Sequence, residues 1–311
     1  MARLFTGLQP SGALHIGNYF GVLKPFLELS REYEASLMIA DYHALTSLKD
    51  PADLRGNIIE VARAYIAAGI DPQRSVIFKQ SDVPEHTELA WIFQCLVTVS
   101  FLELAHAFKD KVTKGLEANA GLFAYPMLMA ADILLYDTDI VPVGADQKQH
   151  VEYAREAASK FNNAFGETFK LPQSRIIVGV GVVPGTDGKK MSKSYGNTIP
   201  LFGTKEELTK AVMSIVTDSS GEKPENVYAI HKLFRESGQL ETVYSENKGK
   251  YKALKEILIE DIESVVAPMR ERHDAITDEE IRQMLAAGGN RARAQASMKM
   301  MDVKQKIGVS I

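Results

Sequence analysis

Five short apolar runs, separated by stretches with helical periodicity, are the feature that most narrows the possible folds of this chain. They lie at residues 3–8, 35–41, 75–78, 139–144 and 176–183. Strands that alternate with helices form parallel βαβ units, so we expect an α/β fold with a doubly wound parallel sheet. Ligands bind such sheets beyond the carboxyl ends of the strands. That rule places residues 8–18, 41–43 and 80–82 around one crevice.

The pattern changes near residue 201, after which helical periodicity dominates. Helices are expected at residues 227–236, 250–274 and 277–306. A chain of 311 residues is long enough for one large or two modest domains. We expect a catalytic domain at residues 1–200, with a helical insertion at about 85–136. An all-helical domain would follow at residues 201–311, and its last helix could pack back on the first domain.

Charge and cysteine content exclude several classes of protein. The net charge is −4, so a nucleic acid would have to bind to a local patch. The single cysteine, Cys95, excludes a disulfide framework and a cysteine metal cluster, and we expect it to be buried. One basic patch is a stripe on the last helix, although a solvated helix face explains it more simply. The stripe consists of Arg291, Arg293, Lys299, Lys304 and Lys306.

Targeting and membrane signals are not evident in the sequence. The N-terminus has no long apolar segment followed by a small-residue cleavage site. No run approaches the ~18 uninterrupted apolar residues of a membrane helix. We therefore expect a cytoplasmic protein with no membrane partner.

The turn after the first strand is a candidate anion site. Residues 9–12, Gln-Pro-Ser-Gly, precede a helix that opens near Leu14. The free N–H groups and the dipole of a helix N-terminus favour phosphate. His15 and Asn18 lie one turn apart and could bond phosphate oxygens, while Gly17 lets a ring or phosphate approach the backbone. The spacing matches neither G-x-G-x-x-G nor the Walker A loop.

A second candidate site is the lysine loop, residues 189–197, with the sequence Lys-Lys-Met-Ser-Lys-Ser-Tyr-Gly-Asn. It follows an apolar run and a turn, so its lysines could close over a polyanion. Lysine is a compact cation on a flexible stem, and charge placed where phosphate charge develops is a large catalytic term. A loop of this kind considered alone is usually a solvated turn.

One charged residue, Asp132, interrupts the apolar run at residues 120–136. Burying a carboxylate is expensive unless it is paired. A structural ion pair or cap would explain it, and so would a specificity group that accepts a hydrogen bond from a buried ligand. The physical argument alone favours neither explanation.

Residues 6–18 together with residues 190–194 resemble the paired signatures of the class I aminoacyl-tRNA synthetases. The first segment reads Thr-Gly-Leu-Gln-Pro-Ser-Gly-Ala-Leu-His-Ile-Gly-Asn and the second Lys-Met-Ser-Lys-Ser. Residues 125–136 and 141–150 are similar to the bacterial tryptophanyl type, and Asn18, where the class usually has histidine, supports that type. The resemblance covers nearly the whole chain. The tyrosyl type shares both signatures and is the near alternative.

The resemblance implies a Rossmann-like catalytic domain and a tryptophan–tRNA ligase activity. The carboxylate of L-tryptophan would attack ATP to give tryptophanyl-adenylate and pyrophosphate, and tryptophan would then pass to the 3′ end of tRNA(Trp). Mg²⁺ would accompany ATP, and we assign no metal-ligating residue. The family also implies a homodimer and an anticodon-binding role for residues 201–311. Because a carboxylate attacks, positioning and charge stabilisation would carry the catalysis.

The same resemblance implies the site residues. The catalytic groups would be His15, Asn18, Lys111, Lys190 and Lys193. ATP would contact Gln9, Pro10, Ser11, Gly17, Asn18, Gly144, Ala145, Asp146, Val182, Val183, Lys190, Met191, Ser192, Lys193 and Ser194. The tryptophan pocket would contain Phe5, Gly7, His43, Tyr125, Met129, Asp132, Val141, Val143 and Gln147.

Within this pocket, the resemblance implies that Asp132 accepts the indole N–H. A site built around such a hydrogen bond rejects analogues that lack it by ~10⁴–10⁵. Ala145 stands where the family usually has glutamate, which puts in doubt any role of a carboxylate there. Two further hypotheses remain open: an inactive synthetase-like regulatory or RNA-binding protein, and a nucleotidyltransferase that does not use tRNA. Against the first, His15, Lys111, Lys190 and Lys193 are all present.

Overall fold

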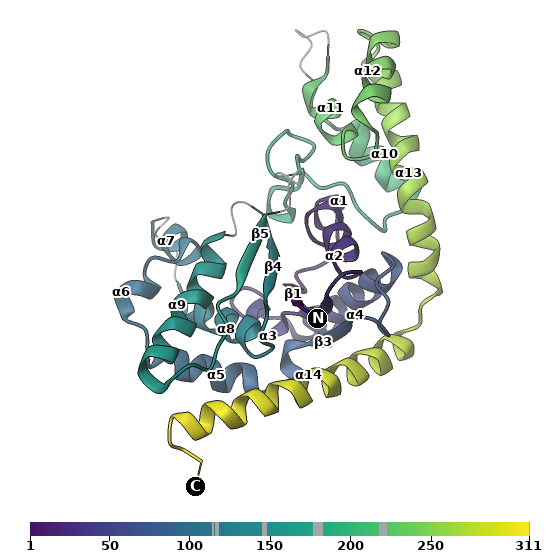
Figure 1. Ribbon diagram of the computed structural model, residues 1–311. Coiled ribbons are helices and arrows are strands. Elements are labelled where there is room, and N and C mark those ends of the chain that lie inside the picture. Colours follow the sequence, from purple (N-terminus) through teal and green to yellow (C-terminus); the bar gives the residue numbers. More distant parts are fainter. Residues whose placement is uncertain (114, 116–117, 145–147, 177–182, 218–222, 311) are drawn as a thin grey trace.

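A central sheet of five parallel strands organises the chain (Figure 1), and the order of the strands is β3-β2-β1-β4-β5. The computed structural model describes residues 1–113, 115, 118–144, 148–176, 183–217 and 223–310. The strands are β1 (Arg3–Leu8), β2 (Glu34–Ile39), β3 (Val76–Lys79), β4 (Ile140–Val143) and β5 (Gln173–Ile176). The expected doubly wound parallel sheet is confirmed. Strand order reverses between β1 and β4, where such sheets bind ligands.

Helices cover both faces of the sheet. Alternate residues of one strand enter opposite cores: Leu4 and Leu37 pack on one side, and Phe5 and Met38 on the other. Burial on both faces explains why the strands appear in the sequence as continuous apolar runs. The helices before β5 are α1 (Ile16–Asn18), α2 (Lys24–Leu29), α3 (Asp41–Ala44), α4 (Pro51–Ala67), α5 (Glu85–Gln94), α6 (Val99–Leu102), α7 (His106–Thr113), α8 (Ala120–Leu134) and α9 (Lys148–Phe165).

Local sequence signals set several helix ends. Asp50 caps α4 by accepting hydrogen bonds from the N–H groups of Ala52 and Asp53, and Gly69, with φ of +102°, follows its end. The helix expected after residue 14 is interrupted near Pro25, because a π-helical turn, η1 (Tyr19–Leu23), separates α1 from α2. Proline lacks the N–H of a regular α-helix and collides with the preceding turn.

A group of helices follows the lysine loop and extends away from the sheet. The group comprises α10 (Lys205–Met213), α11 (Glu225–His231), α12 (Ser237–Glu246) and the first part of α13 (Tyr251–Ala275). A capping box opens α10, with Thr204 accepting a hydrogen bond from the N–H of Glu207. No helix among the described residues is long and apolar enough to span a membrane.

The last helix, α14 (Asp278–Lys306), returns to the sheet and lies along β3, its edge strand (Figure 1). The two backbones meet at Gly288, where an added Cβ would lie 1.7 Å from the carbonyl oxygen of Ile77. Only glycine permits such a close approach. An uncovered edge strand exposes unpaired backbone groups, and α14 covers this one.

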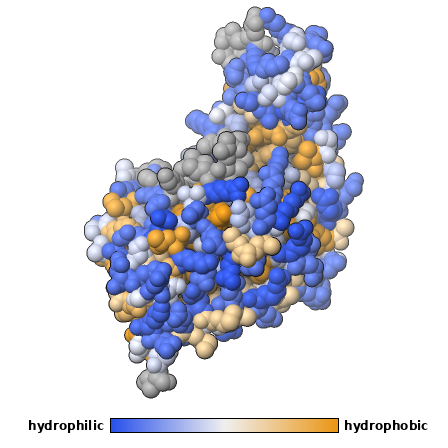
Figure 2. Space-filling model, in the orientation of Figure 1, coloured by the Kyte–Doolittle hydropathy of each residue, from blue (hydrophilic) through white to orange (hydrophobic). Residues whose placement is uncertain are grey.

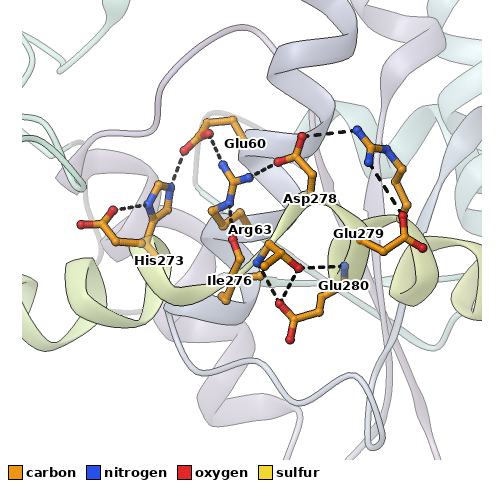
Figure 3. Close-up of polar contacts among 10 residues, drawn as sticks. Glu60, Arg63, His273, Ile276, Asp278, Glu279 and Glu280 are labelled. Carbon is orange, nitrogen blue, oxygen red and sulfur yellow. Dashed lines mark hydrogen bonds and ion pairs between the residues drawn. The ribbon is translucent and has the colours of Figure 1, made fainter.

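The corner between α13 and α14 is held by charged groups of α4 (Figure 3). Arg63 donates from Nε to the carbonyl oxygen of Ile276 at 3.2 Å, and it also pairs with Asp278. Glu60 accepts a hydrogen bond from His273, near the end of α13. Burial lowers the pKa of His273, but hydrogen bonds to Glu60 and Asp274 outweigh it and raise the pKa. The corner is therefore fixed to α4 by polar contacts on both of its sides.

The basic stripe of the last helix is bonded to the first part of the chain, although Arg291 and Arg293 are exposed and the three lysines are half-buried. Each of its members contacts an acceptor located between residues 72 and 167 of the chain. The pairs are Arg291 with the carbonyl of Pro72, Arg293 with Glu85, Lys299 with Asp137, Lys304 with Glu88, and Lys306 with the carbonyl of Glu167. These cations attach α14 to the first part of the chain, so they give no support to a nucleic-acid patch.

Three expectations about local structure were wrong. Cys95 is exposed, because it lies four residues after the exposed Trp91 while Leu89 and Phe93 form the buried face of α5. The fifth strand begins at Gln173 rather than residue 176. It was missed because polar residues at its start are not typical of a buried strand. The strand lies at the edge of the sheet, where polar residues are tolerated. Residues 177–182 of the expected strand lie outside the described residues. The expected helix at 227–236 ends at His231, and α12 was missed because its apolar residues are few.

We expect Gly288→Ala to destabilise the protein by about 1–3 kcal/mol, because the added methyl group must push α14 away from β3. Urea unfolding followed by circular dichroism would measure this change. Gly56→Ala on the exposed face of α4, where an added Cβ meets nothing within 4 Å, is the control and should stabilise by about 0.5–1 kcal/mol. Equal effects of the two substitutions would contradict the proposed contact.

Candidate active site

The two candidate loops, 181 residues apart in the sequence, touch in the fold. Nζ of Lys193 donates a hydrogen bond to the carbonyl oxygen of Gly12 at 2.8 Å. Gly12 has φ of +108°, a conformation that favours glycine. The lysine loop therefore rests on the turn formed by residues 9–12, at the carboxyl end of β1.

Backbone hydrogen bonds join the segments that flank this contact. The N–H of Ile16 donates to the carbonyl of Ile199 at 3.0 Å, and the N–H of Leu201 donates to the carbonyl of Leu14 at 3.0 Å. His15 and Pro200 form an antiparallel bridge between them. The start of α1 is thus fixed to the segment that leaves the lysine loop, and the two loops are held together.

His15 is buried at the N-terminus of α1. Its backbone N–H donates to Oδ1 of Asn18 at 3.0 Å, so these two predicted residues do lie together. The ring that approaches Gly17 is that of His15 itself, because a Cβ at Gly17 would lie 2.8 Å from Nδ1 of His15. Burial and the nearby charge of Lys193 lower the pKa of His15 to about 4. At neutral pH the imidazole is therefore uncharged and can donate one hydrogen bond.

The shape of the lysine loop depends on Asn197, a buried residue at its end. Nδ2 of Asn197 donates to the carbonyl of Lys190 at 3.1 Å and to Oδ1 of Asp187 at 2.7 Å. Its Oδ1 accepts the N–H of Ser192 at 2.8 Å. The side chain therefore fixes the backbone on both sides of Met191.

Two further contacts complete the loop. Met191 is buried, and its N–H donates to the carbonyl of Val183 at 2.8 Å. The hydroxyls of Ser192 and Ser194 lie 2.9 Å apart and share a hydrogen bond. Burial also lowers the pKa of Lys193, whose recorded partner is a neutral carbonyl. This contact positions the ammonium group of Lys193, but the carbonyl does not neutralise its charge as a carboxylate would.

A buried carboxylate lies on the other side of β1. Asp132 on α8 is 2% exposed, and three side chains bond it. Its Oδ1 is 2.8 Å from Nε2 of Gln80 and 2.6 Å from Nδ1 of His86, and its Oδ2 is 2.8 Å from Nε2 of His43. Burial alone would raise the pKa of Asp132, but the hydrogen bonds from His43 and His86 lower it to about 2. The group is therefore a carboxylate at neutral pH.

Apolar and aromatic residues surround this carboxylate. The ring of His43 lies edge-on to Tyr125, with centroids 6.4 Å apart, and the hydroxyl of Tyr125 is 3.2 Å from Nε2 of His150. Phe5 is buried and stacks on Tyr136 at 5.5 Å. Val141 is buried, and Met129 and Val143 are half-buried beside the same core. Gly7 pairs with Met38 between β1 and β2, and it is exposed at the end of the strand.

The structure does not bring all of the predicted site residues together. Ala145, Asp146, Gln147 and Val182 lie outside the described residues. Lys111 lies on α7, which packs on α8. Within the described part of the chain, no recorded contact joins Lys111 to the turn at residues 9–12 or to the lysine loop. Gln9 and Ser11 are exposed on that turn, and Gly144 follows β4.

Three residues of the site were not predicted to take part in it. Gln80 falls in the segment expected at the crevice, but no role was assigned to it. His86 was not assigned to the site either, and it is fully buried against Asp132. Asn197 closes the lysine-loop motif, although its sequence position alone does not indicate that it bonds residues on both sides of Met191. The pairing of His86 with Asp132, 46 residues away, has no periodicity that could reveal it.

Known proteins resemble this chain over almost its whole length. The family model described as tRNA synthetases class I (W and Y) matches residues 1–285. The chain is 47% identical to a tryptophan–tRNA ligase from Campylobacter jejuni strain RM1221 over 318 residues, which covers 99% of this chain and 100% of that protein.

Two solved structures support the same relationship. A tryptophanyl-tRNA synthetase from Campylobacter jejuni, complexed with ADP and tryptophan, has a TM-score of 0.90 and 45% identity, and the match covers 98% of this chain and 99% of that one. A tryptophanyl-tRNA synthetase from Mycoplasma pneumoniae has a TM-score of 0.88 and 31% identity over 99% of this chain and 98% of that one.

We expect the pKa of His15 to be about 4. It should rise in a Lys193→Met variant, because the charge of Lys193 is one of the two causes that lower it. The pKa should stay below 6.5 because burial is the larger cause. An NMR titration of the imidazole would measure both values. Lys205→Met, on the exposed start of α10, is the control and should leave the titration unchanged. A wild-type value near 6.5 would show that the ring is not buried as described.

Proposed function

The chain belongs to the class I tRNA synthetases of the tryptophan and tyrosine type, and from that premise we propose that it joins L-tryptophan to tRNA(Trp) at the expense of ATP. Tryptophan is favoured over tyrosine because ligases for tryptophan match at 44–47% identity over 99% of the chain. The observation that carries the proposal is the contact of Lys193 with Gly12. It brings the two candidate phosphate-binding loops together at the carboxyl end of β1.

The proposed reaction has two steps. An oxygen of the tryptophan carboxylate forms a bond to the α-phosphorus of ATP, and the bond from that phosphorus to the bridging oxygen breaks. Pyrophosphate leaves with the electron pair. A ribose hydroxyl at the 3′ end of the tRNA then attacks the carbonyl carbon of the adenylate, and AMP leaves. The first step needs no nucleophile from the protein, because the substrate supplies one.

Phosphate stabilisation is assigned to the joined loops. His15 is neutral, so it would donate a hydrogen bond to a phosphate oxygen rather than supply charge. Lys193 and Lys190 would supply the positive charge as the α-phosphorus is attacked. Asn197 bonds the backbone between these two lysines and would keep their relative positions fixed. Positioning of this kind is the main demand of a reaction in which the substrate is the nucleophile.

Tryptophan selection is assigned to the cluster around Asp132. The carboxylate is ionised and buried, so an indole N–H is a suitable partner for it. Tyr125, Met129, Val141 and Val143 would contact the rings. The remaining members of the predicted set keep their proposed roles. For tryptophan these are Phe5, Gly7, His43 and Gln147. For ATP they are Gln9, Pro10, Ser11, Gly17, Asn18, Gly144, Ala145, Asp146, Val182, Val183, Met191, Ser192 and Ser194.

ATP and magnesium are proposed to bind together. The described residues include no group of three or more histidine, cysteine or acidic side chains arranged to hold a metal. The donors of the joined loops are instead lysine and histidine, which suit phosphate oxygens. Mg²⁺ would therefore be carried by the phosphates of ATP, and it would offset their negative charge. Lys111 is proposed as a further phosphate ligand on family likeness alone.

The tRNA is proposed to contact the group of helices that extends from the sheet. Residues 201–311 would form the anticodon-binding unit, although α14 belongs by its contacts to the sheet. We propose that the binding residues lie on α10, α11, α12 or the first part of α13, the helices that extend away from the sheet. ATP and tRNA are cytoplasmic substrates, and we propose that compartment.

A homodimer is proposed through the apolar surface of α5, α6 and α7. Trp91, Val99 and Val112 are each more than half exposed on these helices, at 66%, 65% and 53%. Apolar side chains gather over the side of the molecule that carries α6 and α7 (Figure 2). Exposed apolar patches of this kind mark protein interfaces. Analytical ultracentrifugation would test this assignment.

Exchange of labelled pyrophosphate into ATP, run without tRNA and with each amino acid in turn, tests the proposed chemistry. We expect exchange with tryptophan alone, because only tryptophan places an indole N–H at Asp132. Exchange with tyrosine would keep the fold and the mechanism but overturn the specificity. No exchange with any amino acid, while ATP still binds, would favour a regulatory protein or a different nucleotidyltransferase.

We expect Asp132→Asn and Lys193→Ala to affect different steps. Asp132→Asn should lower kcat/KM for tryptophan by roughly 10–100-fold, because a hydrogen bond to a buried charged group is lost, with little change in the KM for ATP. Lys193→Ala should lower kcat by roughly 10²–10³-fold, as expected for loss of a transition-state donor, with smaller changes in either KM. Steady-state pyrophosphate exchange measures both. Equal losses of ATP affinity in the two variants would contradict the assignment.

A further inference from the structure

The hydrogen bonds behind Asp132 assign a role to residues that the proposed pocket does not include. We propose that Gln80 and His86 occupy one oxygen of the Asp132 carboxylate and thereby leave the other oxygen to receive the substrate N–H. They would be positioning residues for amino-acid selection, acting through Asp132. The inference rests on the proposed function, because it concerns how the same pocket recognises tryptophan.

The orientation of the Gln80 amide is fixed by the backbone that follows β2. Oε1 of Gln80 accepts the N–H of Tyr42 at 3.2 Å and the N–H of His43 at 3.3 Å. Its Nε2 is therefore directed to the opposite side, where it donates to Oδ1 of Asp132 at 2.8 Å. Gln80 is fully buried, so this arrangement excludes competition from water.

The ionised carboxylate of Asp132 sets the direction of its bond with His86, because a carboxylate can only accept a hydrogen bond. Nε2 of His86 is 2.8 Å from the hydroxyl of Tyr136, and Nδ1 is 2.6 Å from Oδ1 of Asp132. Burial, followed by the charges of Asp132 and Glu85, raises the pKa of Tyr136, so its hydroxyl keeps its proton and can donate to Nε2. Nδ1 of His86 therefore carries a proton and donates it to Asp132.

A count of acceptor positions identifies the oxygen that stays available. An ionised carboxylate offers about four acceptor positions, two on each oxygen. Gln80 and His86 use both positions of Oδ1, and His43 uses one position of Oδ2. One position on Oδ2 remains. It lies on the oxygen that faces His43, whose ring meets Tyr125, a predicted pocket residue.

The consequence for selectivity follows from the geometry. With Oδ1 held by two donors from η2 (Gln80–Asp82) and α5, the carboxylate cannot rotate when a ligand arrives. Without the His86 donor, the Asp132 carboxylate can rotate, and fewer hydrogen bonds offset the cost of burying its charge. The titratable groups that face Asp132 are His43 from α3, His86 from α5 and Tyr136 just after α8. Loss of the His86 bond should raise the pKa of Asp132, because burial then weighs more.

Two substitutions at one position separate the role of each ring nitrogen. His86→Asn keeps a donor near the place of Nδ1 and loses the partner of Tyr136, whereas His86→Gln keeps a group near the place of Nε2 and loses the donor to Asp132. Tyr136→Phe is a third variant that removes only the hydroxyl. Each would be compared by pyrophosphate exchange with tryptophan and with the benzothienyl analogue, in which sulfur replaces the indole N–H.

We expect His86→Gln to lower the ratio of kcat/KM for tryptophan to that for the analogue by roughly 10–100-fold, with the KM for ATP unchanged. His86→Asn should keep more of this ratio than His86→Gln, whatever its overall rate. Tyr136→Phe should lower the ratio by a smaller factor. The acid limb of kcat/KM for tryptophan should move to higher pH in His86→Gln, since a raised pKa lets Asp132 take up a proton earlier as the pH falls.

The outcomes are distinguishable. An unchanged ratio in both His86→Gln and Tyr136→Phe, or equal loss of the ratio in His86→Gln and His86→Asn, would overturn the positioning role while the wild-type protein still exchanges with tryptophan. If His86→Gln does not fold, Tyr136→Phe alone decides between a lowered ratio and an unchanged one. A wild-type protein that exchanges with another amino acid, or with none, would overturn the proposed function itself and this inference with it.

Discussion

The buried carboxylate of Asp132 is the interaction on which the centre of this structure depends. An isolated charge in an apolar core costs several kcal/mol, and here three donors from three different elements offset it. His43 comes from α3 after β2, Gln80 from the turn after β3, and His86 from α5. The carboxyl ends of two strands and three helices are therefore joined through one acidic group. Removal of any one donor would leave the buried charge less well offset, because only two donors would remain.

Local sequence signals predicted the framework of the fold well. Apolar runs at strand length predicted the parallel sheet, and the capping residues Asp50 and Thr204 stand where α4 and α10 begin. These signals act within a few residues, so a sequence displays them directly. The doubly wound rule then placed residues 8–18, 41–43 and 80–82 at one end of the sheet. The contact between Lys193 and Gly12 lies at that end.

The features that sequence analysis missed depend on contacts between distant residues. His86 and Asp132 are bonded because α5 packs on α8, and no local pattern records that packing. Cys95 lies on the solvent side of α5 because the other side meets the core, which hydrophobicity alone does not reveal. The basic stripe on α14 resembled a free surface, yet α14 crosses β3 at Gly288 and directs its cations to acceptors near the sheet.

The proposed phosphate site brings two basic groups close together, and the pKa values of both groups reflect their surroundings. His15 is held neutral by burial and by the charge of Lys193. Lys193 in turn bonds a carbonyl, a weaker partner than an anion. Burial lowers the pKa of Lys193 as well, so both groups have a pKa below the ordinary value for their type. A polyanion placed between them would favour their protonated forms. Holding two basic groups close together destabilises the folded loops. A bound triphosphate would offset that destabilisation, because its negative charge attracts both groups.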